Sequence, residues 1–382
     1  MPSPWGDDQL KNLSVALVGS RNFPAKHGGL EIVVESIANR FADRQLAVHV
    51  FVGNANDPDV DTGEGLESGR FQVHATKAVS GKYWHTASQI LSGMAEVRRL
   101  KPDIVNIHGV GPAFPLAFSK RAFGNAPTLV TAHGLDWERT KWPPLARWLF
   151  RKIAVRALRN ATSVSCVSDS VGADLSSLLG VDVVTTLNGF DSLDFPGSVD
   201  VDLPPKYTIS MSRLTPEKNI EAIISAYTPE VADEWGPLII LGGGSSSYAG
   251  AYETKLMDLA SDRDVIFLGE QSRGDALSIV SKASLFISMS QLEARPMAVI
   301  EAMSLGVPLV LSDIGPHKEL CGDSARYVSL EDETGLQALL MDPESETEVR
   351  ERVTSALDRV ASMTWERSTD TYVSWYESCL GR

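Results

Sequence analysis

Two glutamates, Glu293 and Glu301, stand eight positions apart in the otherwise apolar segment SQLEARPMAVIEAMSLGVP at residues 290–308. Pro296 fits the first turn of a helix, because its missing N–H costs nothing there. Glu293 would then precede the helix, and Glu301 would lie inside it. Carboxylates accept hydrogen bonds from vicinal hydroxyls, and a helix N-terminus at Pro296 and Met297 suits an anion. The segment could hold hydroxyl, phosphate and hydroxyl in a row. A capping charge at Glu293 and a solvated Glu301 explain it equally well.

Glycines and cations follow two other predicted strands. Gly28 and Gly29 precede an amphipathic helix, where a ligand could approach the backbone and where free N–H groups face an anion. A turn that needs positive φ is an equal alternative. Arg213 ends a strand and Lys218 lies five residues on, so the two could clamp a diphosphate. Spacing alone favours a solvated surface pair. The fingerprint G-x-G-x-x-G is absent from both turns, which argues against NAD binding.

The elements that would position these residues are short β-rich runs that alternate with amphipathic segments. The runs predict two series of buried parallel strands, at 13–19, 47–52, 103–109, 128–134 and 163–168, and at 207–213, 237–243, 264–270, 284–290 and 308–313. Such alternation predicts α/β architecture with doubly wound, Rossmann-like sheets and right-handed crossovers. Ligands of these sheets bind outside the carboxyl ends of the strands, so we expect a cleft there between two domains.

Length and charge also indicate two domains. The chain has 382 residues, which exceeds one typical core. Residues 1–195 carry 20 Lys/Arg and 19 Asp/Glu, a net charge of +1, whereas residues 196–382 carry 15 and 30, a net charge of −15. The polar segment 188–206 holds three prolines and predicts the linker. We therefore expect domains at 1–195 and 196–363, with an aromatic-rich helix at 364–382 packing back on the first.

The composition excludes several classes of protein. The chain is 43% hydrophobic, and its apolar runs are too short to span a membrane. The N-terminus lacks the profile of a signal peptide. Three scattered cysteines fit neither a disulfide framework nor a zinc site, which favours a reducing cytoplasm. The acidic charge argues against nucleic acid as a partner. The acidic run at 57–61 lacks the glycine and glutamate of a calcium loop, so we interpret it as solvated.

The segment 139–159, RTKWPPLARWLFRKIAVRALR, carries seven basic residues and no acidic one. Its basic and aromatic residues suit an anionic membrane surface. The alternative is an ordinary amphipathic helix packed on the sheet, with Trp148 in the core.

Five segments resemble one enzyme family. The run EARPMAVIEAMSLGVP is similar to the E-x7-E motif of retaining glycosyltransferases of family 4, which have the two-domain GT-B fold. LSDIGPHKEL, SMSRLTPEKNIE, GSRNFPAKHGGLE and TAHGLDWERTKW also resemble family segments, the last two in bacterial enzymes that build surface polysaccharides, including rhamnosyltransferases. The likeness covers nearly the whole chain. Asn22, His27 and Arg295 depart from the usual residues, which concerns sugar and acceptor specificity more than the reaction type.

The resemblance implies a role for each matching residue. Arg213 and Lys218 would neutralise the diphosphate leaving group, Glu293 would bind donor-sugar hydroxyls, and Glu301 would bind the ribose. The other implied contacts are donor phosphates at Gly28 and Gly29, the helix start at Pro296 and Met297, the donor sugar at His133, and the acceptor at Asp136 and Glu138. From the residues alone, His133 is equally a core histidine satisfied by backbone.

The implied reaction is retaining transfer from a nucleotide-diphosphate sugar to a glycan or lipid-linked acceptor in bacterial polysaccharide or glycolipid synthesis. Attack and departure would occur on the same face, with the donor phosphate helping to deprotonate the acceptor. No cofactor and no metal are expected, since Arg and Lys replace the metal. The alternatives are a nucleotide-sugar epimerase of the same fold and a non-catalytic nucleotide-sugar binding protein.

Overall fold

The structure is a computed structural model, and it describes residues 13–20, 22–25, 29–54, 71–76, 84–138, 143–190, 202–243 and 249–381. Gly28, the acidic run 57–61, residues 139–142 of the basic segment and most of the predicted linker lie outside these ranges. The chain divides into an N-terminal unit, Met1–Gly189 with Thr364–Arg382, and a C-terminal unit, Phe190–Met363. The division falls six residues before the boundary expected from the sequence.

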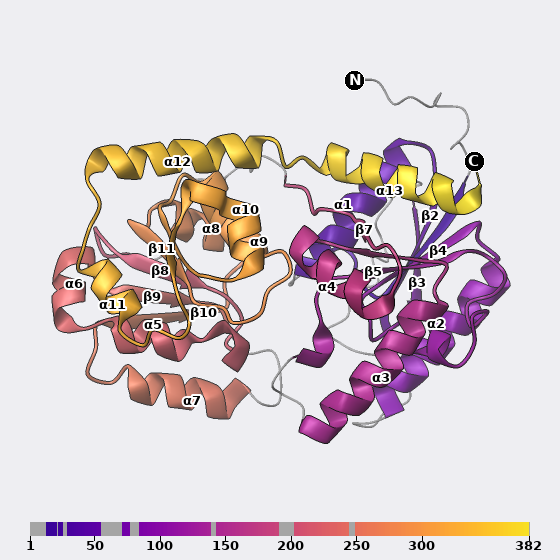
Figure 1. Ribbon diagram of the computed structural model, residues 1–382, viewed down its shortest axis with the longest axis horizontal. Coiled ribbons are helices and arrows are strands. Elements are labelled where there is room, and N and C mark those ends of the chain that lie inside the picture. Colours follow the sequence, from indigo (N-terminus) through magenta and orange to yellow (C-terminus); the bar gives the residue numbers. More distant parts are fainter. Residues whose placement is uncertain are drawn as a thin grey trace. The chain divides into compact units, whose positions relative to one another are not determined.

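The N-terminal unit is built on a parallel sheet with the strand order β3-β2-β1-β4-β5-β6-β7 (Figure 1). Its strands are β1 (Ser14–Val18), β2 (Ala47–Asn54), β3 (Phe71–Thr76), β4 (Ile104–His108), β5 (Thr128–Ala132), β6 (Ser163–Cys166) and β7 (Val184–Thr185). Its helices are α1 (Gly29–Asp43), α2 (Trp84–Leu100), η1 (Phe114–Ala117), η2 (Asp136–Glu138), α3 (Pro144–Asn160), α4 (Asp169–Leu179) and α13 (Trp365–Leu380).

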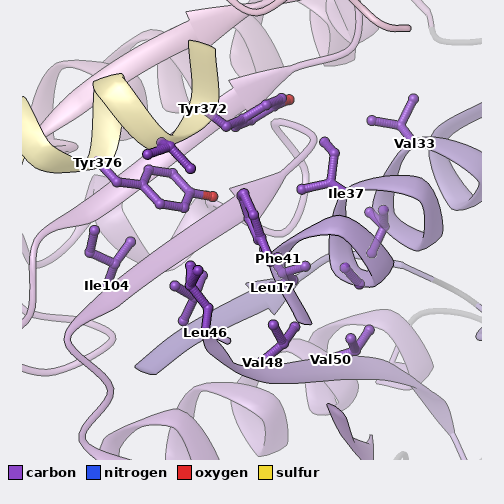
Figure 2. Packing of buried hydrophobic residues seen from close by; sticks show 14 of the residues in the cluster. Leu17, Val33, Ile37, Phe41, Leu46, Val48, Val50, Ile104, Tyr372 and Tyr376 are labelled. Carbon is purple, nitrogen blue, oxygen red and sulfur yellow. The ribbon is translucent and has the colours of Figure 1, made fainter. Parts of the chain in front are cut away.

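Helices α1 and α13 bury their apolar faces on one face of this sheet (Figure 2). Phe41 of α1 contacts the rings of Tyr372 and Tyr376, both fully buried. The Tyr376 hydroxyl accepts a hydrogen bond of 2.7 Å from Asn106 of β4, and the Asn106 side chain accepts one of 3.1 Å from Thr131 of β5. Because these buried polar atoms satisfy one another, the aromatic residues of α13 have a structural role.

The C-terminal unit repeats the pattern with the order β10-β9-β8-β11-β12-β13. Its strands are β8 (Thr208–Met211), β9 (Leu238–Leu241), β10 (Val265–Gly269), β11 (Leu285–Ser288), β12 (Leu309–Ser312) and β13 (Arg326–Val328). Its helices are η3 (Pro216–Lys218), α5 (Ile220–Ala226), α6 (Pro229–Trp235), α7 (Ala249–Leu259), α8 (Arg273–Ser281), α9 (Met297–Ser304), α10 (Gly315–Cys321), η4 (Gly322–Ser324), α11 (Gly335–Leu340) and α12 (Glu346–Ala361).

Both faces of this second sheet are covered, which explains its continuous apolar strands. Successive side chains of a strand point to opposite faces. Thus Ile239 and Leu241 join a core with α8, α9, α10 and α12, whereas Leu238 and Ile240 join a core with α5, α6, α7 and α11.

The predicted fold class is confirmed, since each unit is a doubly wound, Rossmann-like parallel sheet. All ten predicted strands form, with ends that shift by one or two residues. The edge strands β3, β7 and β13 were not predicted. In the described ranges, no helix is both long enough and apolar enough to cross a bilayer.

Candidate functional site

The strand order of the C-terminal unit reverses between β8 and β11. In doubly wound sheets this switch point is where ligands bind, beyond the carboxyl ends of the strands. The loops after the two strands are joined there, because the Gln291 N–H donates a 2.8 Å hydrogen bond to the Glu217 carbonyl. The loop after β9 also comes close: Gly242 has φ +127°, and a Cβ there would meet the Ser212 carbonyl oxygen at 2.0 Å. Glycine is therefore required at this position.

A lysine and a glutamate meet at this switch point. Lys218 ends η3, the short helix after β8, and Glu293 lies in the loop after β11. The Lys218 ammonium donates to Glu293 Oε1, and the two side chains are 17% and 12% exposed. This mostly buried ion pair joins two loops whose residues are 75 positions apart in the sequence.

The environment keeps Glu293 ionised. Burial alone would raise the pKa of Glu293, but the Lys218 ammonium, hydrogen bonds from Lys218 and Ser290, and nearby His317 together lower it. A carboxylate that is ionised at pH 7 beside an ammonium can accept hydrogen bonds from ligand hydroxyls. The ammonium retains further N–H donors for an anion.

His317 is a site residue that sequence reasoning missed. The Ser312 hydroxyl donates to the Ser290 carbonyl at 2.6 Å, which leaves the His317 Nδ1–H to donate to the Ser312 carbonyl at 3.0 Å. His317 Nε2 is buried and has no hydrogen-bond partner among the described residues. Burial lowers the pKa of His317, although the bond to Ser312 and the charge of Glu293 oppose this. A neutral histidine thus lies behind the ion pair. The quoted motif LSDIGPHKEL contained it, but only the fold brings it to Glu293.

The sequence predicted that Pro296 lies in the first turn of a helix. In the structure helix α9 begins at Met297, and Pro296 is the residue just before it. No side chain caps this N-terminus. The Val299 N–H donates to the Pro296 carbonyl at 3.1 Å, and the partial positive charge at the start of the helix favours an anion.

Glu301 lies further along α9 and is only 7% exposed, so it is not a solvated helix residue. Arg273, at the start of α8, approaches Glu301 Oε1 at 3.2 Å and is a second residue that the sequence did not predict. Burial raises the pKa of Glu301, and Arg273 opposes the rise.

Arg213 follows β8 and is exposed, and it forms no ion pair within the described ranges. Lys218 pairs with Glu293, and Arg213 does not join this ion pair among the described residues. Among the same residues, no three His, Cys, Asp or Glu side chains gather as metal ligands.

In the N-terminal unit the order reverses between β1 and β4, and two histidines lie near that edge. His108 ends β4 and His133 follows β5, with His108 Nδ1 3.0 Å from His133 Nε2. Burial lowers the pKa of His133 to about 4, and burial and the neighbouring His133 hold the pKa of His108 well below its usual value. Both rings are therefore neutral at pH 7, and the partner of His133 among the described residues is the ring of His108.

The remaining predicted residues of this unit lie on two elements. Gly29 is exposed and begins α1, and the start of a helix carries partial positive charge that favours an anion. Asp136 and Glu138 belong to η2. Partial desolvation and Asp174 raise the pKa of Glu138, against Arg151 and Arg147.

Comparison with known proteins bears on what such a site does. The profile of Glycosyltransferase Family 4 matches residues 27–192, and that of Glycosyl transferases group 1 matches residues 194–361. Together they span most of the chain.

Two curated relatives and one solved structure illustrate the similarity. A Bacillus subtilis protein named as a teichuronic acid biosynthesis glycosyltransferase is 24% identical over 278 residues, 70% of this chain and 64% of the relative, which is just under two thirds of its length. The GDP-mannose:cellobiosyl-diphosphopolyprenol alpha-mannosyltransferase of Xanthomonas campestris is 22% identical over 372 residues, 94% of this chain and 96% of the relative. Sucrose-phosphate synthase from Thermosynechococcus elongatus superposes with a TM-score of 0.80 and 19% identity over 96% of this chain and 99% of that one, which shows the shared fold.

Proposed function

Because the chain belongs to glycosyltransferase family 4, with the GT-B type of fold, we propose that it is a retaining, metal-independent hexosyltransferase. The donor would be a nucleotide-diphosphate sugar, and the acceptor a glycan or a lipid-linked saccharide. Relatives named for teichuronic acid biosynthesis and for mannosyl transfer to a cellobiosyl-diphosphopolyprenol support a role in polysaccharide or glycolipid synthesis. We place the reaction in the bacterial cytoplasm, at the inner face of the cell membrane.

The observation that carries the proposal is the buried Lys218–Glu293 pair at the switch point of the C-terminal sheet. Negative charge builds on the diphosphate as the glycosidic bond breaks. A cation that the fold holds in place stabilises this charge without reorganisation. Lys218 supplies such a cation, and exposed Arg213 adds a second that is free to turn toward a ligand.

Neighbouring groups of the protein would bind the other parts of the donor. The uncapped start of α9 suits a phosphate oxygen. Glu293, kept ionised, would accept hydrogen bonds from sugar hydroxyls, and Glu301 would accept them from the ribose. Donor contacts of Gly28, Gly29, Pro296, Met297 and His133, and acceptor contacts of Asp136 and Glu138, remain part of the proposal. The neutral state of His133 suits hydrogen bonding to a sugar hydroxyl.

Retention would follow from attack on the face that the leaving group departs. The acceptor proton would pass to an oxygen of the departing diphosphate, so that no protein base is assigned. GDP-mannose is the first donor to test, because one relative that aligns over nearly the whole chain is named for it.

The experiment is a transfer assay with the purified full chain. GDP-, UDP-, ADP- and dTDP-sugars are supplied with and without a short-chain polyprenyl-diphosphate saccharide, in the presence of EDTA. Acceptor-dependent release of nucleoside diphosphate, with the anomeric configuration of the donor kept in the product by NMR, supports the proposal.

Other outcomes assign the alternatives. Conversion of the donor sugar without any acceptor would identify an epimerase. Thermal stabilisation by a donor without turnover would identify a binding protein. Loss of transfer in EDTA, restored by a divalent cation, would contradict metal independence.

A further inference from the structure

Helix α3 of the N-terminal unit has one buried face and one solvent-exposed face, which is called its bare face below. Ala154, Ala157 and Leu158 are at most 1% exposed. On the opposite side, Leu145, Trp148 and Leu149 are 76%, 58% and 52% exposed. Trp148 is therefore not part of the core, the alternative that the sequence left open. At 3.6 residues per turn, Lys152 and Arg156 continue the line of Leu145 and Leu149 along this bare face.

A loop distant in sequence extends the same surface. Arg156 Nε donates to the Ala117 carbonyl at 2.6 Å, and Asn160 Nδ2 donates to the Leu116 carbonyl at 2.8 Å. The loop that starts at Phe118 thus begins beside the bare face of α3. Phe118 is 81% exposed, and with Leu145 it is the most exposed large hydrophobic side chain in the described ranges. Lys120 and Arg121 follow it and are exposed.

The charge of this region opposes that of the whole protein. Residues 143–160 hold five Arg or Lys and no Asp or Glu, in a chain of net charge −14. Bonds from Arg156 and Arg159 to backbone carbonyls fix these two side chains without neutralising them. Lys152 lies 5.7 Å from the centre of the Trp148 ring. Arg147 and Arg151 lie close enough to Glu138 for their charges to lower the pKa of that carboxyl.

We propose that this docking surface, formed by Phe118, Lys120, Arg121, Leu145, Trp148, Leu149 and Lys152, binds an anionic phospholipid bilayer. Bare aromatic and aliphatic side chains suit insertion into the headgroup region, and the adjacent cations suit lipid phosphates. A nucleic acid would match the cations but not the exposed Leu145, Leu149 and Phe118. The inference does not depend on the donor chemistry, because it uses no residue to which a donor or acceptor contact is assigned.

The test is co-sedimentation of the full chain with two kinds of vesicle. One kind is pure phosphatidylcholine, and in the other about one lipid in three is phosphatidylglycerol. The charge variant is Lys120→Ala/Arg121→Ala/Lys152→Ala, and the insertion variant is Leu145→Ser/Trp148→Ser/Phe118→Ser. The matched controls remove exposed residues of the same kinds from the C-terminal unit, as Lys282→Ala/Arg350→Ala and Met257→Ser. All changed side chains are exposed, and circular dichroism checks that the variants fold.

We expect binding to anionic vesicles only, weakened by high salt. Each cation near an anionic surface contributes roughly a fivefold factor, so the charge variant should bind about 100-fold more weakly. The insertion variant should also lose binding, and both controls should bind like the parent. Absence of binding to anionic vesicles, or equal binding by the parent and both variants, overturns the proposal. A dimer that the insertion variant abolishes, without vesicle binding, would assign the surface to a second copy of the chain instead.

Discussion

Replacement of Lys218 by alanine tests the electrostatics of the site. The Lys218 and Glu293 side chains are only 17% and 12% exposed, so the substitution leaves a carboxylate that is largely cut off from water. Loss of one partner of a buried pair costs about 3–5 kcal/mol. Because some solvent still reaches both side chains, we expect Lys218→Ala to lower the free energy of unfolding at pH 7 by about 3 kcal/mol, the lower end of that range.

The pH dependence of this loss has a definite sign. The folded pKa of Glu293 lies below its unfolded value of about 4.3, so the pair stabilises the parent above that pH and the benefit disappears on acidification. Without Lys218, burial dominates and raises the pKa of Glu293. The variant then gains stability, relative to its own value at pH 7, as Glu293 takes up a proton. The deficit of the variant should therefore shrink between pH 7 and pH 4.

The assay is urea unfolding of both proteins at several pH values, followed by circular dichroism. Lys318→Ala is the matched control, because Lys318 pairs with Asp313 at 2.5 Å but the side chains are 55% and 38% exposed. That surface pair should contribute at most ~1 kcal/mol. A Lys218→Ala deficit that equals that of the control, or that stays constant with pH, would refute the reasoning.

Three other substitutions test separate parts of the structure. Gly242→Ala places a Cβ 2.0 Å from the Ser212 carbonyl oxygen and should destabilise by more than ~2 kcal/mol in urea unfolding, whereas Gly250→Ala in α7, with nothing within 4 Å, should be neutral or stabilise by up to ~1 kcal/mol. Glu301→Gln removes a carboxylate whose pKa burial raises, so melting at pH 7 should hold or rise while calorimetric nucleotide affinity falls about tenfold; a fall in both would contradict this. The pKa of His133 is about 4 when folded and about 6.5 when unfolded, so the neutral ring favours folding above pH 6.5 and this benefit is lost as pH falls toward 4. His133→Gln should flatten the plot of unfolding free energy against pH between these values, and an unchanged slope of that plot would contradict a neutral His133.

Much of the fold could be predicted because central strands carry their own signal. Runs such as LIIL of β9 are apolar on both faces and end at turn residues. The strands β7 and β13 are two and three residues long at sheet edges, too short for such a signal. β3 alternates weakly, with only its last residue buried. The shortness of β7 and β13 and the weak alternation of β3 explain these misses, because the edge strand β10, with five residues, was predicted.

At the candidate site, the sequence identified several residues but not the contacts between them. Lys218, Glu293 and Glu301 were each singled out, yet nothing in their spacing indicated that Lys218 pairs with Glu293 or that Arg273 pairs with Glu301. Those contacts arise because parallel strands bring distant loops to one edge. Trp148 shows a different limit, since helical periodicity alone could not decide whether its face is buried or bare.

We propose that the C-terminal unit recognises a diphosphate through Arg213 and Lys218. Isothermal titration calorimetry of a nucleoside diphosphate against the matching monophosphate tests this recognition most directly, with the full chain and with Arg213→Ala/Lys218→Ala. We expect the parent to prefer the diphosphate by at least roughly tenfold and the double variant to lose this preference, since each charge-assisted hydrogen bond contributes about 1.5–3 kcal/mol. A preference of equal size in both proteins would contradict it.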